Sequence, residues 1–153
     1  RAIVQAGDGF DGLKAVLPPP PRRGVILIDP SYEDKTDYRR ARQALAEGLV
    51  RFRTGTFALW YPIVQRRESR QLSVALERMG APDWVHVTLV VKAPAPDGYG
   101  LHGSALFVVN PPWTLARTLR ETLPWLVDVL AQDASAGFTL QTGTVRRPRA
   151  EAG

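Results

Sequence analysis

Along the chain, short continuous apolar stretches alternate with longer stretches whose apolar residues recur every three or four positions. Residues 24–28 form one of the continuous stretches, which ends at Asp29 and is typical of a central parallel strand that is apolar on both faces. Residues 35–52 carry apolar residues such as Tyr38 and Leu45 at helical spacing. These two patterns predict a strand followed by an amphipathic helix.

The same patterns divide the rest of the chain. Further strands are predicted at residues 2–6, 56–61, 84–91, 104–110 and 138–142, and further helices at residues 10–17, 66–79 and 114–131. Pro62 is expected to stop the strand before it. Strands that first alternate with helices and then follow one another directly predict an α/β fold, in which a mainly parallel sheet carries antiparallel strands at one edge.

The length of 153 residues suits one domain, and the chain shows no internal repeat and no linker. Residues 1–145 are assigned to this domain, and residues 146–153 are expected to form a basic, disordered tail. The chain opens with Arg1 and its one methionine is Met79. Residue 1 is therefore not expected to be the natural start of translation.

Composition limits the location and the chemistry of the protein. The chain has no cysteine, which excludes disulfides and thiolate metal sites and fits a reducing compartment. No apolar run approaches the ~20 residues that span a bilayer, and no secretory signal is visible. We therefore expect a cytoplasmic protein that works without a membrane, a metal ion or an obligate protein partner.

The formal net charge is +5 and arginine dominates the basic residues. This charge suits a polyanionic partner such as a nucleic acid, because each phosphate contact releases counterions. An arginine- and alanine-rich genome would produce the same composition, so both explanations stay open.

Residues 7–12 read Gly-Asp-Gly-Phe-Asp-Gly and match the G-x-G-x-x-G pattern of dinucleotide-binding proteins. That pattern needs a full crossover helix whose N-terminus holds a pyrophosphate. The predicted helix has barely two turns and runs into the four prolines of residues 18–21. A nicotinamide-binding fold is therefore disfavoured.

The segment Asp29-Pro30-Ser31-Tyr32 is the strongest candidate for chemistry. An acid at the carboxyl end of a central strand points into the crevice where open α/β sheets bind ligands. The Asp29 carboxylate and the Pro30 carbonyl could accept both hydrogens of an adenine amino group and position its poorly nucleophilic nitrogen for attack on a methyl donor. Tyr32 would offer a face on which an extruded base stacks. A strand that ends in an Asp-Pro turn covered by Tyr32 explains the same residues without any function.

The segment Asn110-Pro111-Pro112-Trp113 repeats this pattern late in the chain, on a strand predicted to lie in the antiparallel part of the sheet. Asn is a good helix N-cap and proline a good first helical residue, so we interpret this segment as the structural start of a helix.

Five segments, in the same order, resemble the RlmJ-like family of bacterial 23S ribosomal RNA adenine-N6 methyltransferases. They are residues 6–10 (AGDGF), 22–38 (RRGVILIDPSYEDKTDY), 55–62 (GTFALWYP), 109–113 (VNPPW) and 123–126 (LPWL). The resemblance implies a class I, Rossmann-like, S-adenosylmethionine-dependent methyltransferase fold. This chain would be its C-terminal, catalytic half, without the N-terminal part that carries the glycine-rich loop.

The resemblance also implies roles for individual residues. Asp29 matches the catalytic acid and is expected to act with Pro30 and Tyr32. Asp8 and Gly9 match the pair that contacts S-adenosylmethionine, a contact to which Asp29 also belongs. Lys35 lies in the matching Lys-Thr-Asp-Tyr stretch, and a contact with RNA phosphate is our own inference, not one that the resemblance implies; a solvated helix start is the simpler explanation.

One residue departs from the family pattern, which has a second proline where this chain has Ser31. A residue before proline is restricted to extended geometry, so we expect Pro30 to be held less rigidly here. The function expected is methyl transfer to an adenine of 23S ribosomal RNA, with this chain alone inactive. The alternatives are a non-enzymatic RNA-binding remnant and an adenine-N6 methyltransferase that acts on DNA.

Overall fold

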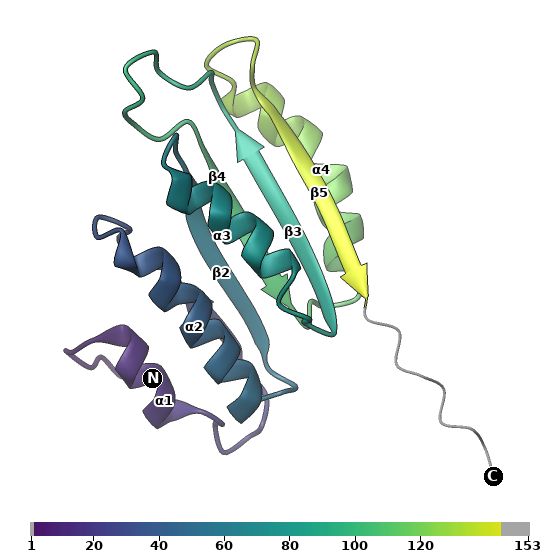
Figure 1. The fold of residues 1–153 in the computed structure, drawn as a ribbon. Helices are drawn as coiled ribbons and strands as arrows, with labels where there is room; N and C mark the ends of the chain where they lie inside the picture. The colour runs from purple at the N-terminus through teal and green to yellow at the C-terminus, as the bar shows by residue number, and fades with distance from the viewer. Residues whose placement is uncertain (1, 145–153) are drawn as a thin grey trace.

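The computed structural model describes residues 2–144, which form a five-stranded sheet with helices on both faces (Figure 1). The elements in chain order are α1 (Gly9–Val16), β1 (Val25–Ile28), α2 (Thr36–Arg51), β2 (Thr56–Ile63), α3 (Arg67–Glu77), β3 (Asp83–Val90), β4 (Gly103–Val109), α4 (Leu115–Leu130) and β5 (Gly137–Thr144). The four predicted helices and five of the six predicted strands are confirmed, each within a few residues.

The strands lie in the order β1-β2-β4-β3-β5. Only the β1–β2 pairing is parallel, and the other three pairings are antiparallel. The α/β class with a mixed sheet is therefore confirmed, but the described sheet is mostly antiparallel and not mainly parallel as predicted, because β3, β4 and β5 pair with their neighbours without a parallel crossover. Because β1, β2 and β3 all run in one direction, their carboxyl ends meet at one edge of the sheet, and β4 and β5 end at the opposite edge.

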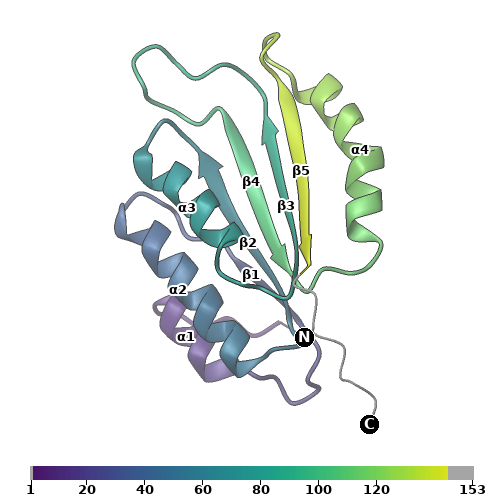
Figure 2. The same cartoon turned by 45° about the vertical axis from the view of Figure 1, so that its right-hand side comes forward.

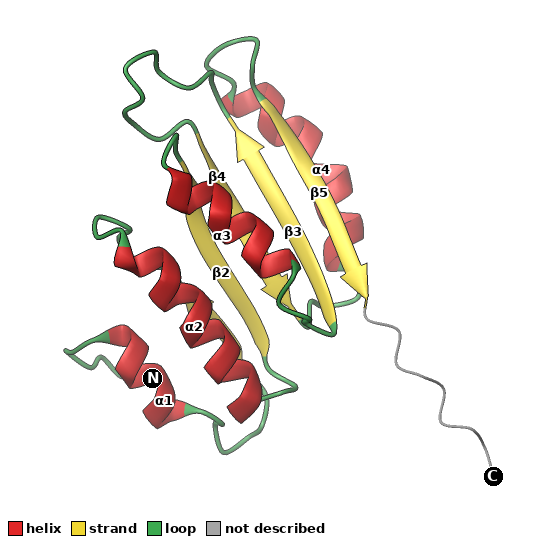
Figure 3. Cartoon of the chain, viewed as in Figure 1, coloured by secondary structure: helices red, strands yellow, loops and turns green. Residues whose placement is uncertain are grey.

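The helices form two layers. Helices α1, α2 and α3 cover one face of the sheet, and α4 lies on the other face beside β3 and β5 (Figure 2). The loops that lead into α2 and α3 leave the carboxyl ends of β1 and β2. The long connection from β3 to β4 lies at this same edge (Figure 3).

The core lies between the sheet and the layer of α2 and α3. In β2 the alternate residues Phe57, Leu59 and Tyr61 are buried, as expected for a strand that turns one face towards helices. In α2, Ala41 and Leu45 are buried at helical spacing and meet this face. The apolar periodicity that predicted these elements therefore also identifies their buried sides.

A buried polar chain links α3 to two strands. The Tyr61 hydroxyl lies 2.7 Å from Nε2 of His86, and Nδ1 of His86 lies 2.8 Å from Oε1 of Glu77. Burial raises the pKa of Tyr61 to about 12, so its phenol stays protonated at physiological pH. Each polar group has a partner, as buried polar groups require.

Two sequence predictions about strands in the N-terminal part of the chain are wrong. Residues 2–6 form no strand, and Ile3 and Val4 are 83% and 93% exposed, because no neighbouring strand pairs with them in the described part of the chain. β1 is the outermost strand of the described sheet and not a central one, and Val25 and Leu27 are exposed on one face. Apolar residues on both sides of a strand indicate what the strand can pack against, and not which strands lie beside it.

Pro62 does not stop β2, which continues to Ile63 with Pro62 opposite Ser104 of β4. The pairing of β1 with β2 ends at Leu59. Beyond that point β2 has a free side, where a proline without an N–H interrupts no ladder.

The predicted tail, residues 146–153, and residues 1 and 145 lie outside the described residues. Among the described residues no helix is long and apolar enough to cross a membrane.

Candidate active site

The candidate acid Asp29 follows β1 directly, at the edge of the sheet where β1, β2 and β3 end. Its side chain is exposed and lines a pocket of about 350 Å³. The other residues of this pocket come from the end of β1, from Pro30 and from the first two turns of α1, namely Gly9, Phe10, Leu13, Leu27 and Ile28. The fold therefore brings together Asp29 and the Asp8-Gly9 segment, which are about 20 residues apart in the sequence.

Asp8 caps α1, the helix that forms this wall of the pocket. Its Oδ1 accepts hydrogen bonds from the N–H groups of Phe10 and Asp11 at 2.9 and 3.4 Å. Its other oxygen forms an ion pair with Arg40 of α2. The Arg40 guanidinium and the backbone N–H groups together hold the pKa of Asp8 below its usual value. Asp8 thus has a structural function that the sequence analysis did not anticipate.

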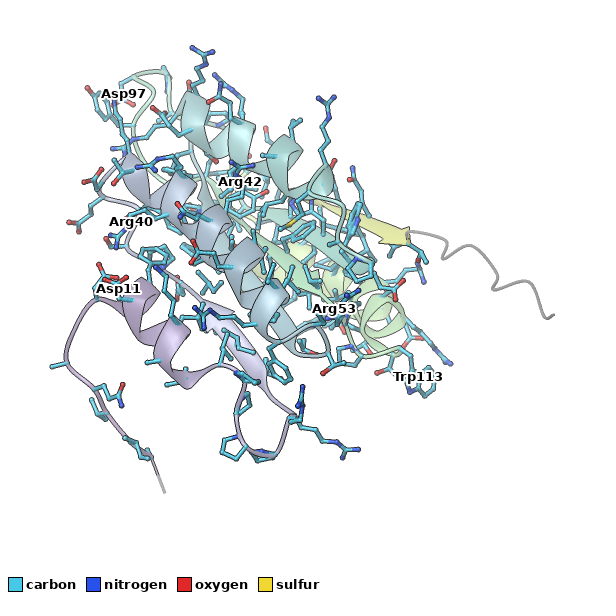
Figure 4. The ribbon with its side chains drawn as sticks, turned by 60° about the horizontal axis from the view of Figure 1, so that its bottom comes forward. Asp11, Arg40, Arg42, Arg53, Asp97 and Trp113 are labelled. Carbon is cyan, nitrogen blue, oxygen red and sulfur yellow. The ribbon has the colours of Figure 1, made fainter. Side chains whose placement is uncertain are left out.

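Arg40 joins α1 to α2. Besides its ion pair with Asp8, its guanidinium lies 4.4 Å from the centre of the Phe10 ring. Figure 4 shows Arg40 on the side of α2 that faces α1, and Arg42 on the side that faces α3. Arg40 therefore orients the helix that carries Gly9 and Phe10. Because α2 contains several arginines, the sequence does not indicate which of them has this role.

Tyr32 lies in the core, with 3% of its surface exposed. Its hydroxyl donates to the Trp60 carbonyl at 2.6 Å, and its ring centre lies 4.7 Å from that of Tyr38. Burial and the nearby charge of Asp29 raise the pKa of the Tyr32 phenol. Tyr32 is thus packed between α2 and β2, as expected if the segment is only a structural turn. Its ring does not line the Asp29 pocket.

The backbone of Tyr32 is left-handed, with φ of 56°. This conformation costs a residue with a side chain about 1–2 kcal/mol, and such strain often accompanies functional segments. The Tyr32 carbonyl accepts a hydrogen bond of 3.4 Å from Arg66, which directly precedes α3. The chain thus turns sharply between Pro30, which lines the pocket, and Tyr32, which is buried.

Lys35 lies away from the Asp29 pocket. It is exposed at the start of α2 and lines a separate groove between α2 and α3. The structure therefore groups Asp29, Pro30 and Gly9 around one pocket, places Asp8 at the cap of its helix wall, and leaves Tyr32 and Lys35 outside it.

Asn110 has a structural role, although not the predicted one. Its side-chain amide donates to the carbonyls of Arg53 and Gly55, both at 2.8 Å, and its own carbonyl accepts from the Thr56 hydroxyl. The predicted helix cap is wrong, because α4 begins at Leu115 and its N-cap is Thr114. The amide instead fastens the end of β4 to the loop before β2.

The pocket suits one part of the methyl donor that the resemblance implies. Its volume lies in the range of small-molecule sites, and Phe10, Leu13 and Leu27 give it apolar walls beside one carboxylate. These features fit an adenosine group. None of the described residues that line the pocket is cationic, so this chain offers no partner for a methionine carboxylate there.

Comparison with known proteins identifies the family of the chain. The family model "Ribosomal RNA large subunit methyltransferase D, RlmJ" matches residues 1–142. The chain is similar to "Ribosomal RNA large subunit methyltransferase J" of Haemophilus influenzae, with 41% identity over 92% of this chain and 50% of that protein. It is also similar to the protein of the same name from Escherichia coli K12, with 47% identity over 82% of this chain and 45% of that protein.

A crystal structure of a Legionella pneumophila protein also matches, with a TM-score of 0.80 and 30% identity over 90% of this chain and 50% of that chain. The chain thus spans about half the length of the relatives that it matches. Since the family model covers nearly all of its residues and its fold follows that of the solved relative, the chain belongs to the RlmJ family of ribosomal RNA large subunit methyltransferases.

Proposed function

We propose that this chain carries the catalytic residues of an enzyme that transfers a methyl group from S-adenosylmethionine to the N6 amino group of an adenine in 23S ribosomal RNA. The observation that supports this proposal best is the exposed Asp29 carboxylate, which lies at the carboxyl end of β1 in one pocket with Gly9 and Phe10. Because the relatives are about twice as long, the activity is proposed for the protein in which this chain is joined to the remaining half.

Asp29 is proposed to hold the amino group of the target adenine. Among the described residues no group donates a hydrogen bond to its carboxylate, so both oxygens are available to a ligand. With the Pro30 carbonyl as a second acceptor, the two amino hydrogens would be held and the nitrogen kept in line for attack. S-adenosylmethionine, when bound, supplies the electrophilic methyl group. The rate increase would then come from positioning.

Asp8 and Gly9 are proposed to form the adenosine side of the donor site. Asp8 can still accept from an amino group, because a carboxylate has about four acceptor positions and the cap and ion pair occupy only some of them. Gly9 has open space where a Cβ atom would be, which allows a ligand to approach its backbone closely.

Stacking of the target base on Tyr32 stays a prediction. It requires the ring to leave its contact with Tyr38 and turn towards the pocket. Release of the left-handed backbone at Tyr32 would offset part of the cost of this movement. The proposed substrate also places the work of the protein in the cytoplasm, where ribosomes are assembled.

Replacement of the acid tests the proposal. In the intact protein that carries this chain, Asp29→Ala should lower methyl transfer to unmethylated 23S ribosomal RNA by at least 100-fold, since both acceptor oxygens are lost. Asp128→Ala, at an exposed position on α4, is the matched control and should retain activity. Full activity of Asp29→Ala would remove Asp29 from the reaction.

The product and the acceptor define the function further. Nucleoside analysis of the methylated RNA should show N6-methyladenosine, and a methyl group on any other atom would contradict the proposal. DNA of the same sequence should be a poor acceptor. Preferential methylation of DNA would support the DNA alternative, and binding of RNA without any transfer would support the non-enzymatic remnant.

A further inference from the structure

A groove runs between α2 and α3 on the outer side of the helix layer. The two helices lie side by side over the same face of the sheet in Figures 1 and 2. The groove has a volume of about 320 Å³, and its cationic side chains are Lys35, Arg39 and Arg42 of the α2 side. Glu68 is the one carboxylate among the residues that line it. The lining therefore carries more positive than negative charge.

A second, more open depression continues this surface across α3. Arg67, Arg70 and Arg78 line it, and Gln71 and Ala75 belong to both hollows, so the two are continuous. The row from Arg67 to Arg78 extends along about 16 Å of helix at 1.5 Å per residue. This length exceeds what one small anion needs and suits a chain of phosphates.

Within the described part of the chain, none of the cations that line the two hollows forms an ion pair. Among the described residues, the arginines in ion pairs are Arg40, which holds α1, and Arg117, which pairs with Glu121 on α4. Arg39, Arg42 and Arg70 have no carboxylate within 4 Å in that part of the chain and are exposed. Keeping several like charges close together without partners costs free energy through repulsion, which an external polyanion would relieve.

The groove is separate from the Asp29 pocket but begins at the same end of the sheet. Lys35 follows Asp29 by six residues, and α2 and α3 both begin at the edge of the sheet where Asp29 lies. Arg66, just before α3, donates to the carbonyl of Tyr32 and so joins the start of α3 to the Asp29–Tyr32 segment. An RNA strand that extends from the Asp29 pocket past the start of α2 would therefore reach the groove.

We propose that the α2–α3 groove, defined by Lys35, Arg39, Arg42, Arg67, Arg70 and Arg78, binds the phosphate backbone of the RNA that flanks the target adenine. This inference rests on the proposed function, because it takes RNA as the substrate. Guanidinium groups bind phosphate oxygens in a bidentate manner, and each contact releases condensed counterions. The groove would fix the position of the RNA, and base recognition would remain with the Asp29 pocket.

The test compares two triple variants of the intact protein that lose the same charge. Arg39→Gln, Arg42→Gln and Arg70→Gln are combined in the groove variant, and Arg23→Gln, Arg53→Gln and Arg120→Gln in the control variant. All six side chains are exposed, and the control residues lie outside the groove. Filter binding to an unmethylated ribosomal RNA hairpin is measured from 50 to 300 mM salt, and thermal melting checks that both variants fold.

For the groove variant, affinity at about 0.1 M salt should fall at least 10-fold, and the slope of log K against log salt should flatten by about 2 to 3, since each phosphate contact contributes about 0.7 to 0.9. The control variant should keep its slope within 1 and its affinity within about 3-fold. Equal losses in both variants, or none in either, would overturn the proposal. Tighter binding of DNA of the same sequence would overturn the assignment to RNA.

Binding and turnover separate this inference from the proposed function. If the wild-type protein transfers no methyl group but only the groove variant loses its salt slope, the proposed reaction fails and the groove is confirmed. If methyl transfer proceeds and the two triple variants bind RNA equally, the groove is wrong and the reaction stands.

Discussion

Two segments of this chain share the pattern of a short polar residue, proline and an aromatic residue, and the fold uses them in opposite ways. Asp29-Pro30-Ser31-Tyr32 follows β1, and Asn110-Pro111-Pro112-Trp113 follows β4. Because β1 is parallel and β4 antiparallel to β2, the two segments lie at opposite edges of the sheet. Only the first lies where the parallel strands end.

The two segments also differ in which group is free. The Asn110 amide is occupied by two backbone carbonyls. Trp113 is 91% exposed, and Figure 4 shows it at the lower right of the ribbon. The Asp29 carboxylate lines a pocket and accepts no hydrogen bond from residues 2–144, and Tyr32 is buried. Both N–H donors of the Asn110 amide are taken by backbone carbonyls, whereas the Asp29 carboxylate keeps acceptor positions for a ligand. The pattern of residue types alone cannot distinguish these cases.

The largest effect expected from this comparison is on catalysis at Asp29. Asp29→Asn keeps one acceptor oxygen in place but loses the charge, so methyl transfer should fall about 10- to 100-fold, less than the loss of about 10²- to 10³-fold expected for Asp29→Ala. Single-turnover rates with unmethylated RNA would measure both. Equal rates for Asn and Ala would show that the remaining oxygen does not bind the amino group.

Asn110→Ala should act on stability instead. It removes two hydrogen bonds to backbone carbonyls at a left-handed position, with φ of 51°, which asparagine tolerates better than alanine. We expect a loss of about 2 kcal/mol in the free energy of unfolding, measured by urea denaturation. The rate of methyl transfer per folded molecule should not change.

The control for Asn110 is Trp113→Ala, which should change stability by less than about 0.5 kcal/mol because the side chain is almost fully exposed. If Asn110→Ala lowered methyl transfer as strongly as Asp29→Ala without loss of stability, the contrast between the two segments would be wrong.

A smaller effect is expected at the aromatic residue of the first segment. Tyr32→Phe removes the hydrogen bond to the Trp60 carbonyl in a buried environment and should cost about 1 kcal/mol. Tyr38→Phe is the matched control, because no hydrogen bond of the Tyr38 hydroxyl is found within the described residues. Equal unfolding curves for the two variants would contradict a stabilising role of the Tyr32 hydroxyl.

The smallest effect concerns the docking of α1 against α2. The pKa of Asp8 is lowered in the folded protein, so its contribution to stability is present above the ordinary value of 3.8 and is lost as the pH falls through the lower folded value. The protection of α1 amides from exchange, relative to the intrinsic rate at each pH, should therefore fall below about pH 4. Asp8→Asn keeps a helix-capping side chain but loses the ion pair, and should remove this pH dependence.

High salt should reduce the same contribution of Asp8, because its ion pair with Arg40 is exposed. An α1 whose exchange keeps the same dependence on pH in Asp8→Asn as in the wild type would show that another group is responsible.

The sequence by itself determined the order of helices and strands and the place of Asp29 at the end of a strand. These features follow from local physics, since a helix or strand buries one side and repeats its apolar residues with its own period. The resemblance identified the family on the same residues. Residues 2–6 and Pro62 were misjudged because pairing depends on which strand lies alongside.

Only the tertiary structure decided which polar groups are occupied. Arg40 lies next to Asp8 because α2 packs beside α1, and Asn110 meets two carbonyls because β4 pairs with β2. These contacts join residues that are 32 to 57 positions apart in the chain. No local pattern encodes such distances, because they result from the packing of whole elements.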